Sequence, residues 1–166
     1  MQELIQQASK AATAMKELDA LYAKFVQVAK QPSPNWKPEL GNMAAASSGI
    51  TCYALGRKIS ATPRAVALHG RIQALEFDFV HTWEGGECPL LRLYLQPSGW
   101  FSRDLVGQEQ FQAHDDPAIK DDLVLELCPA LLASPAFAPK PGTPVVDTTR
   151  VVSLGASYRG RVQAVG

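Results

Sequence analysis

Three histidines carry most of the potential for chemistry in this chain of 166 residues. Imidazole serves both acid–base catalysis and metal binding. His69, His81 and His114 lie in separate segments, and no His-x-x-x-His or Cys-x-x-Cys spacing links them to a further ligand. Such spacings are what place two ligands on one face of a helix or one side of a turn. The sequence therefore predicts no metal and no cofactor.

His81 is the most informative of the three, because a turn follows it closely. The segment Glu84–Glu87 has Gly-Gly at its centre, and a hairpin there would carry Glu87 and Cys88 back toward His81. Imidazole, carboxylate and thiolate together could bind a metal or activate a nucleophile. We favour the simpler interpretation, a histidine at a sheet edge with a local hydrogen bond. His81, Glu87 and Cys88 stay candidate ligand-binding residues, and the catalytic residues are unknown.

His114 is followed by two aspartates and a proline. A carboxylate beside an imidazole would support an acid–base pair. Neighbouring residues on a loop rarely converge, however, and Asp115-Asp116-Pro117 resembles a helix start with an aspartate cap and proline in the first turn. We therefore interpret this segment as capping chemistry.

Other motifs are missing or weak. The chain has no Walker loop, dinucleotide loop or Gly-x-Ser-x-Gly elbow. Basic and aromatic residues could form a sheet platform for single-stranded nucleic acid. The candidates for such a platform are Arg57, Lys58, Arg92, Tyr94 and Trp100, with Arg64, Arg71, Trp83 and Phe101 near them. Glu76 and Asp78 are expected on the same polar face, which disfavours this alternative.

Composition points to an ordinary globular protein. Hydrophobic residues make up 46% and charged residues 19%, and 16 basic residues balance 16 acidic ones. A nucleic-acid binder usually has a basic surplus, whereas a net charge of zero permits self-association. The three cysteines are sparse, which fits free thiols in a reducing compartment. We find no signal peptide and no apolar run of membrane-spanning length, so we expect a cytoplasmic protein with no membrane partner.

Residues 1–31 give the clearest structural signal. Eight apolar residues follow the 4-3 spacing of a heptad repeat, and good helix formers surround them. They are Leu4, Ala8, Ala11, Met15, Leu18, Tyr22, Phe25 and Ala29, with a second row at Ile5, Ala12 and Val26. Pro32 and Pro34 then end the helix. The spacing predicts one long amphipathic helix.

This helix has two interpretations. Leu4 to Phe25 can form a dimerisation or partner-binding seam, or the helix can lie along its own domain as a core element. Three alanines in the seam favour close but weak packing. The two interpretations are nearly balanced, and we lean toward some intermolecular contact, with a homodimer as the first expectation.

Residues 32–49 are rich in proline, glycine and serine and are expected to form a linker with Trp36 as a local anchor. An antiparallel sheet domain is expected over 50–158. Strands at 71–83, 90–96 and 100–106 should form a meander with one apolar and one polar face. A short strand is also expected at 50–56.

The second half of the chain is harder to interpret. We expect a short helix near 117–127, although LVLELC also alternates like a strand, and Pro129 should end either element. Residues 133–144 contain four prolines and should form an extended loop. One strand near Val151–Leu154 and a loose tail at 159–166 complete the expectation.

Together these patterns predict an α+β fold, with the long N-terminal helix packed on or beside an antiparallel meander. The expected function is a non-enzymatic interaction or regulatory module that self-associates or binds a partner through that helix. Two alternatives stay open. One is a small ligand-binding domain or enzyme with a site between helix and sheet near His81, and the other is single-stranded nucleic-acid binding.

Overall fold

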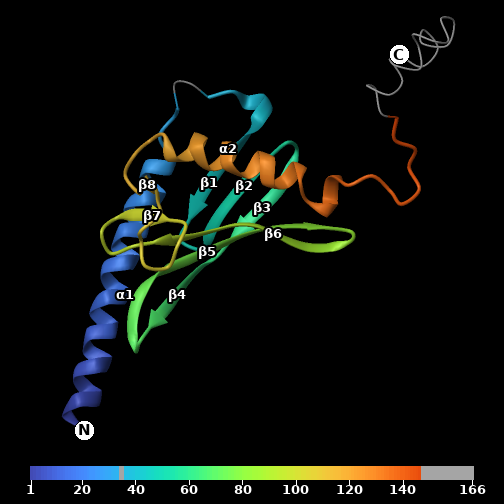
Figure 1. Cartoon of the computed structure of the whole chain (residues 1–166). Helices are drawn as coiled ribbons and strands as arrows, with labels where there is room; N and C mark the ends of the chain where they lie inside the picture. Colours follow the sequence, from blue (N-terminus) through green and yellow to red (C-terminus); the bar gives the residue numbers. More distant parts are fainter. Residues whose placement is uncertain (34–35, 147–166) are drawn as a thin grey trace, which may run out of the picture.

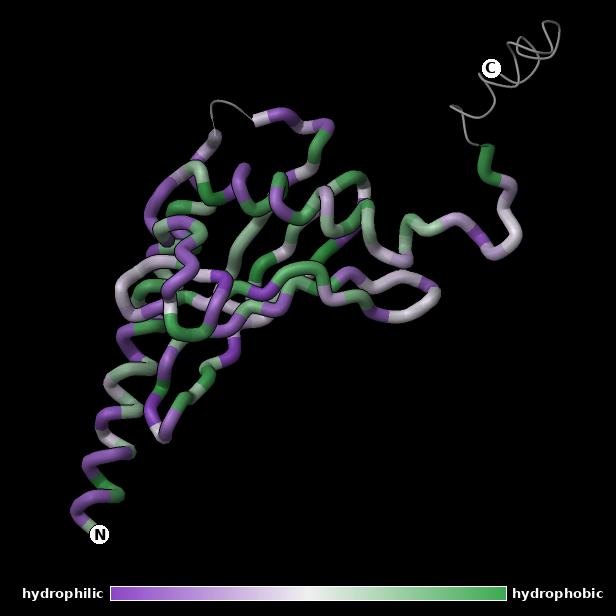
Figure 2. The backbone as a smooth tube through the Cα atoms, in the orientation of Figure 1, coloured by the Kyte–Doolittle hydropathy of each residue, from purple (hydrophilic) through white to green (hydrophobic). Residues whose placement is uncertain are grey.

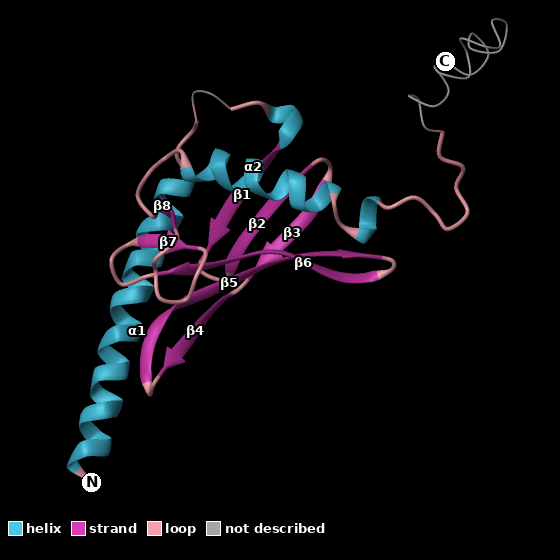
Figure 3. Cartoon of the chain, viewed as in Figure 1, coloured by secondary structure: helices cyan, strands magenta, loops and turns pink. Residues whose placement is uncertain are grey.

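The fold combines one antiparallel sheet with two helices (Figures 1 and 3). The computed structural model describes residues 1–33 and 36–146. Helix α1 spans Gln2–Ala29 and helix α2 spans Ile119–Leu132. Short 3-10 helices lie at Pro38–Leu40 and Pro135–Phe137. The α+β class with an antiparallel sheet, expected from the sequence, is confirmed.

The sheet has the strand order β1-β2-β3-β5-β6-β7-β8, with β4 paired to β5, and every pairing is antiparallel. The strands are β1 (Gly41–Ala46), β2 (Gly49–Ala54), β3 (Arg57–Ala61), β4 (Pro63–Leu68), β5 (Arg71–Trp83), β6 (Gly86–Leu95), β7 (Trp100–Ser102) and β8 (Gln110–Ala113).

The predicted meander corresponds to β5, β6 and β7. Strand β5 has the predicted bounds, and Phe77 pairs with Leu93 on its apolar face. Strand β7 is shorter than predicted and ends at Ser102. The chain turns away there because the carboxylate of Asp104 accepts hydrogen bonds from the backbone N–H groups of Gln108 and Glu109.

One edge of β5 is shared between two strands. Ser60 of β3 pairs with Val80, and further along Pro63 of β4 pairs with Phe77. Strands β4 and β5 are joined by His69 and Gly70, which both have positive φ, as the two central residues of a type I′ hairpin turn require. This hairpin points in the same direction as the N-terminal end of α1 (Figure 1).

The core lies between the apolar face of the sheet and the two helices. Aromatic rings connect α1 to the sheet, with Phe25 5.2 Å from Phe101 and Tyr22 5.4 Å from Phe77 between ring centroids. Such tilted and edge-on contacts are favourable geometries for aromatic pairs. Helix α2 covers β1 and β2 with its buried residues Ile119, Leu123, Val124, Leu127 and Leu131. The C-terminal half of α1 and all of α2 therefore supply the cover that the apolar face needs.

The helix expected near 117–127 is confirmed, but its predicted end is wrong. Helix α2 continues through Pro129 to Leu132. Proline removes one backbone hydrogen bond, to the carbonyl four residues earlier. Here that carbonyl belongs to Leu125, and both Leu125 and Pro129 are exposed, so water can replace the missing bond. Burial of Leu127 and Leu131 on the other face keeps the helix intact.

The linker prediction is wrong for residues 41–49. These residues form β1 and the turn into β2, with Met43 buried. Alanine-rich segments have little preference for strands, so packing against α1 and α2 decides this element. Trp36 packs against the core, as expected for a local anchor.

The later segments correct the sequence interpretation further. The loop expected over 133–144 contains the 3-10 helix Pro135–Phe137, whose Phe137 packs against the core. The strand expected near Val151–Leu154 and the tail at 159–166 lie outside the described residues. Within the part of the chain that the structure describes, neither helix combines the length and the apolar character needed to cross a membrane.

Candidate functional site

Helix α1 is buried along only part of its length. Leu18 and Phe25 are 1% and 0% exposed, whereas Leu4 and Ile5 are 68% and 61% exposed. All of the first ten residues are exposed. Figure 1 shows this N-terminal half extending beyond the sheet, and Figure 2 shows its hydrophobic residues among hydrophilic neighbours. The helix therefore has a core half, which contains Leu18 and Phe25, and a projecting half, which contains Leu4 and Ile5.

The predicted heptad seam is divided between these halves. Leu18, Tyr22 and Phe25 belong to the core, which matches the intramolecular interpretation for that part of the seam. Leu4 and Ala8 are exposed, and Ala11 and Met15 are half-buried. With the second row, five residues that are exposed or half-buried are here called the projecting stripe: Leu4, Ile5, Ala8, Ala12 and Met15. The interaction role predicted for the seam thus remains open only for the projecting stripe.

The projecting half needs little packing to remain helical. Nucleation is the costly step in helix formation, and propagation from an existing turn is nearly free for Ala, Gln, Lys and Glu. The core half supplies that nucleus, and the hydroxyl of Tyr22 donates a 2.5 Å hydrogen bond to the carbonyl of Ala46. Burial raises the pKa of Tyr22 to about 12. The projecting stripe is therefore presented on a rigid support.

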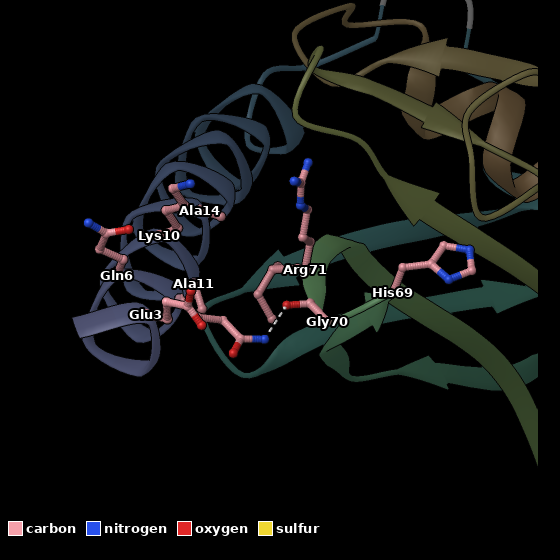
Figure 4. Close-up of a pocket in the computed structure, with 10 residues that line it drawn as sticks. Glu3, Gln6, Lys10, Ala11, Ala14, His69, Gly70 and Arg71 are labelled. Carbon is pink, nitrogen blue, oxygen red and sulfur yellow. Dashed lines mark hydrogen bonds between the residues drawn. The ribbon is translucent and has the colours of Figure 1, made fainter. Parts of the chain in front are cut away.

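A groove of about 480 Å³ separates the projecting half of α1 from the tip of the β4–β5 hairpin (Figure 4). Gly70 leaves room for the end of the Gln7 side chain, because a Cβ atom at position 70 would lie 3.0 Å from Gln7 Nε2. Gln7 Nε2 donates a 3.2 Å hydrogen bond to Gly70 O. The lining residues are Glu3, Gln6, Gln7, Lys10, Ala11, Ala14, His69, Gly70, Arg71 and Ile72.

The groove combines an apolar floor with two cations. Ala11, Ala14 and Ile72 provide the apolar surface, and Figure 4 shows Lys10 and Arg71 extending on the same side while His69 points away from α1. Within the described residues, no carboxylate lies within 4 Å of either cation. This site was not predicted from the sequence. The His-Gly turn was a readable signal for a hairpin, but nothing local indicates that this turn reaches α1.

The strand register shows that the predicted cluster of His81, Glu87 and Cys88 is wrong. His81 pairs with Cys88, but Glu87 pairs with Thr82 and therefore points to the opposite face of the sheet. Among residues 1–33 and 36–146, no group of three metal-ligating side chains comes together. The predicted three-residue site is therefore not formed.

His81 is held as a core residue. It is 3% exposed, its Nδ1 lies 3.0 Å from the carbonyl oxygen of Lys58, and its ring stacks on Trp83 at 6.0 Å. Its Nε2 is buried without a partner among the described residues. This differs from the local hydrogen bond at a sheet edge that we favoured, because the partner Lys58 lies on β3, 23 residues away, and His81 is buried in the core.

The second histidine segment leads into α2, but the predicted aspartate cap and first-turn proline are wrong: the N-cap residue is Ala118, no side chain caps it, and Pro117 comes before it. Asp116 Oδ1 accepts a 2.9 Å hydrogen bond from the backbone N–H of Ala118, just before α2 begins at Ile119. His114 lies apart from this contact, with Nδ1 2.7 Å from the carbonyl oxygen of Gly99. The His-Asp-Asp segment therefore starts a helix rather than forming an acid–base pair.

The basic and aromatic residues do not form one continuous platform. Phe101 is in the core. Arg57 lies over the ring of Phe137, 5.1 Å from its centroid. On the polar face, Arg92 is paired with Asp78 at 3.3 Å. Cross-strand charge pairing accounts for Arg92 and, through Glu76, for Arg64.

Comparison with protein-family models, with curated proteins and with solved structures finds no match to this chain.

Proposed function

We propose that this protein is a non-enzymatic interaction module whose projecting stripe binds an apolar helical surface of another protein chain. The observation that carries the proposal is the exposure of Leu4 and Ile5, at 68% and 61%, on a helix that is otherwise part of the core. Full burial of a large aliphatic side chain is worth about 1.5–3 kcal/mol. Two such residues on one rigid helix provide an apolar anchor for binding.

The geometry of the projecting stripe supports a helical partner. Ala8 and Ala12 lie between the larger side chains, and small residues allow two helices to approach closely. The stripe also continues the heptad spacing of the core half, in which apolar residues already pack on a neighbour. A rigid, preformed helix loses little conformational entropy when it binds.

A second copy of this chain is the first occupant to test. Basic and acidic residues are equal in number, so the net charge does not oppose self-association. The projecting stripe itself carries no charged residue. Two stripes can therefore pack together without burying an unpaired charge.

The experiment places the photo-reactive residue benzoylphenylalanine at position 5 of the full chain and irradiates cells that produce it. Thr13 is the matched control position, because it is exposed on the same helix but lies outside the stripe. We expect an adduct from position 5 and none from position 13, and its mass identifies a second copy or another protein. Equal adducts from both positions, or none from either, would show that the proposal is wrong.

A further inference from the structure

We infer that the groove between α1 and the β4–β5 hairpin accepts carboxylate side chains of an acidic segment in the protein that the projecting half binds. This inference rests on the proposed function and adds the chemistry of the partner. It depends on Lys10 and Arg71, which come from two different elements and extend on the same side of the groove (Figure 4).

The charge of the groove favours an acidic ligand. Three arginines elsewhere in the described residues are paired, Arg64 with Glu76, Arg92 with Asp78 and Arg103 with Glu126. Arg71 and Lys10 have no such carboxylate within 4 Å in the same residues. Glu3 is the acidic residue among the lining residues, so the groove carries a net positive charge. Carboxylates at these two cations would give them the kind of pairing that Arg64, Arg92 and Arg103 already have.

The positions of Lys10 and Arg71 also favour binding in the groove. Arg71 is the first residue of β5 and directly follows the turn formed by His69 and Gly70. Lys10 lies on α1, and the Gln7–Gly70 hydrogen bond joins the helix to that turn. The two cations are therefore carried by two elements that contact each other, through this hydrogen bond and through the packing of α1 on β5. Binding then costs mainly the ordering of two side chains, because the groove already exists.

The lining of the groove favours a polypeptide over a single-stranded nucleic acid as its ligand. Proteins that bind single strands place aromatic rings along a basic path, so that bases can stack on them. Among the described residues, no Phe, Tyr or Trp lines this groove. Its apolar residues Ala11, Ala14 and Ile72 instead suit the methyl and methylene groups of an amphipathic peptide.

The test uses fluorescence anisotropy of the full chain with two labelled amphipathic model peptides of about 14 residues, a length near the lower limit for a stable helix. One peptide contains Leu, Ala and Glu, and the other has Lys in place of every Glu. At low salt we expect the acidic peptide to bind about tenfold more tightly, as two exposed ion pairs allow. The double variant Lys10→Glu with Arg71→Glu should reverse this preference.

A matched control separates local contacts from overall charge. Lys24→Glu with Lys58→Glu changes the net charge by the same amount at two exposed positions that do not line the groove. We expect this control to keep the preference for the acidic peptide. Reversal by the control as well, or no preference in the wild-type protein, overturns the inference.

The remaining outcomes distinguish this inference from the proposed function. If both peptides bind equally and Leu4→Asp weakens their binding, the projecting stripe remains an interaction surface. That outcome overturns the inference of an acidic partner. Binding of neither peptide also overturns the inference, whereas the proposed function is decided separately by crosslinking at position 5. Tighter binding of an oligothymidine than of the acidic peptide, lost in the double variant, assigns the groove to single-stranded nucleic acid instead.

Discussion

The side-chain amide of Gln7 donates a 3.2 Å hydrogen bond to the carbonyl oxygen of Gly70 at the tip of the β4–β5 hairpin. Within the described residues, it is the one side-chain hydrogen bond that joins the first ten residues of α1 to another element. The bond is exposed, and exposed contacts contribute little to stability. The projecting half of α1 is therefore positioned by the hairpin but contributes little to the core.

Removal of residues 1–10 should leave a folded domain. All ten are exposed, so we expect the free energy of unfolding to change by less than about 1 kcal/mol. Urea unfolding followed by circular dichroism checks this. Loss of a cooperative transition would mean that the projecting half is part of the folding unit, and the proposed division of α1 would be wrong.

The two halves of the heptad seam should respond differently to the same substitution. Leu18→Ala should cost about 2–5 kcal/mol, because it leaves a cavity among fully buried neighbours. Leu4→Ala, at a 68% exposed site, should cost less than about 0.5 kcal/mol. Denaturant unfolding of both variants at a concentration where the protein is monomeric measures the difference. Equal losses would contradict the division.

His81→Ala should destabilise the fold rather than remove a ligand site selectively. The change removes the contact with the carbonyl oxygen of Lys58 and opens a cavity next to Trp83, at a cost of about 2–4 kcal/mol. Thr82→Ala, on the exposed face of the same strand, is the control and should change stability by less than about 0.5 kcal/mol. A wild-type melting temperature for His81→Ala would show that this histidine is not held for structural reasons.

Tyr22 should make stability fall at alkaline pH. Burial raises its pKa from 10.0 to about 12, so the unfolded chain loses the phenol proton before the folded chain does. Its stabilising contribution is complete below pH 10 and is lost as the pH rises toward 12. Tyr22→Phe should reduce this alkaline loss and, near neutral pH, cost about 0.5–1.5 kcal/mol for the hydrogen bond to Ala46. Thermal melts of both proteins across this pH range provide the measurement.

Ionisation of Asp122 should destabilise the folded protein, whereas ionisation of a salt-bridged aspartate stabilises it. Burial, and then the nearby charges of Asp116 and Asp121, raise its pKa, so ionisation is harder in the folded protein than in the unfolded chain. This destabilising effect is absent at pH values below the unfolded pKa, and it appears as the pH rises through the folded pKa. Asp122→Asn should therefore raise the melting temperature at neutral pH but not in strong acid. A variant less stable than wild type at neutral pH would contradict the assigned cause.

The elements that the sequence predicted well are those with a strong local period. The bounds of β5 follow from strict alternation between Leu75 and Trp83, and the helix over 1–31 follows from its heptad spacing. Strand β1 was missed, because Asn42 to Ala46 has neither an alternating pattern nor strand-favouring residues. The same local reasoning grouped Glu87 with His81, although the register places them on opposite faces of the sheet.

The sequence by itself determined which face of α1 is apolar and which face of β5 points to the core, because both depend on periods within one segment. Only the tertiary structure decided which half of the α1 seam is buried. An apolar residue leaves water only where another element covers it, and the sheet covers the buried residues between Leu18 and Ala29 but not Leu4. It also decided that the turn at His69 and Gly70 lies beside Gln7, through an interaction between residues 63 positions apart. No local period reports on such a contact, because it depends on how the hairpin and the helix pack in three dimensions.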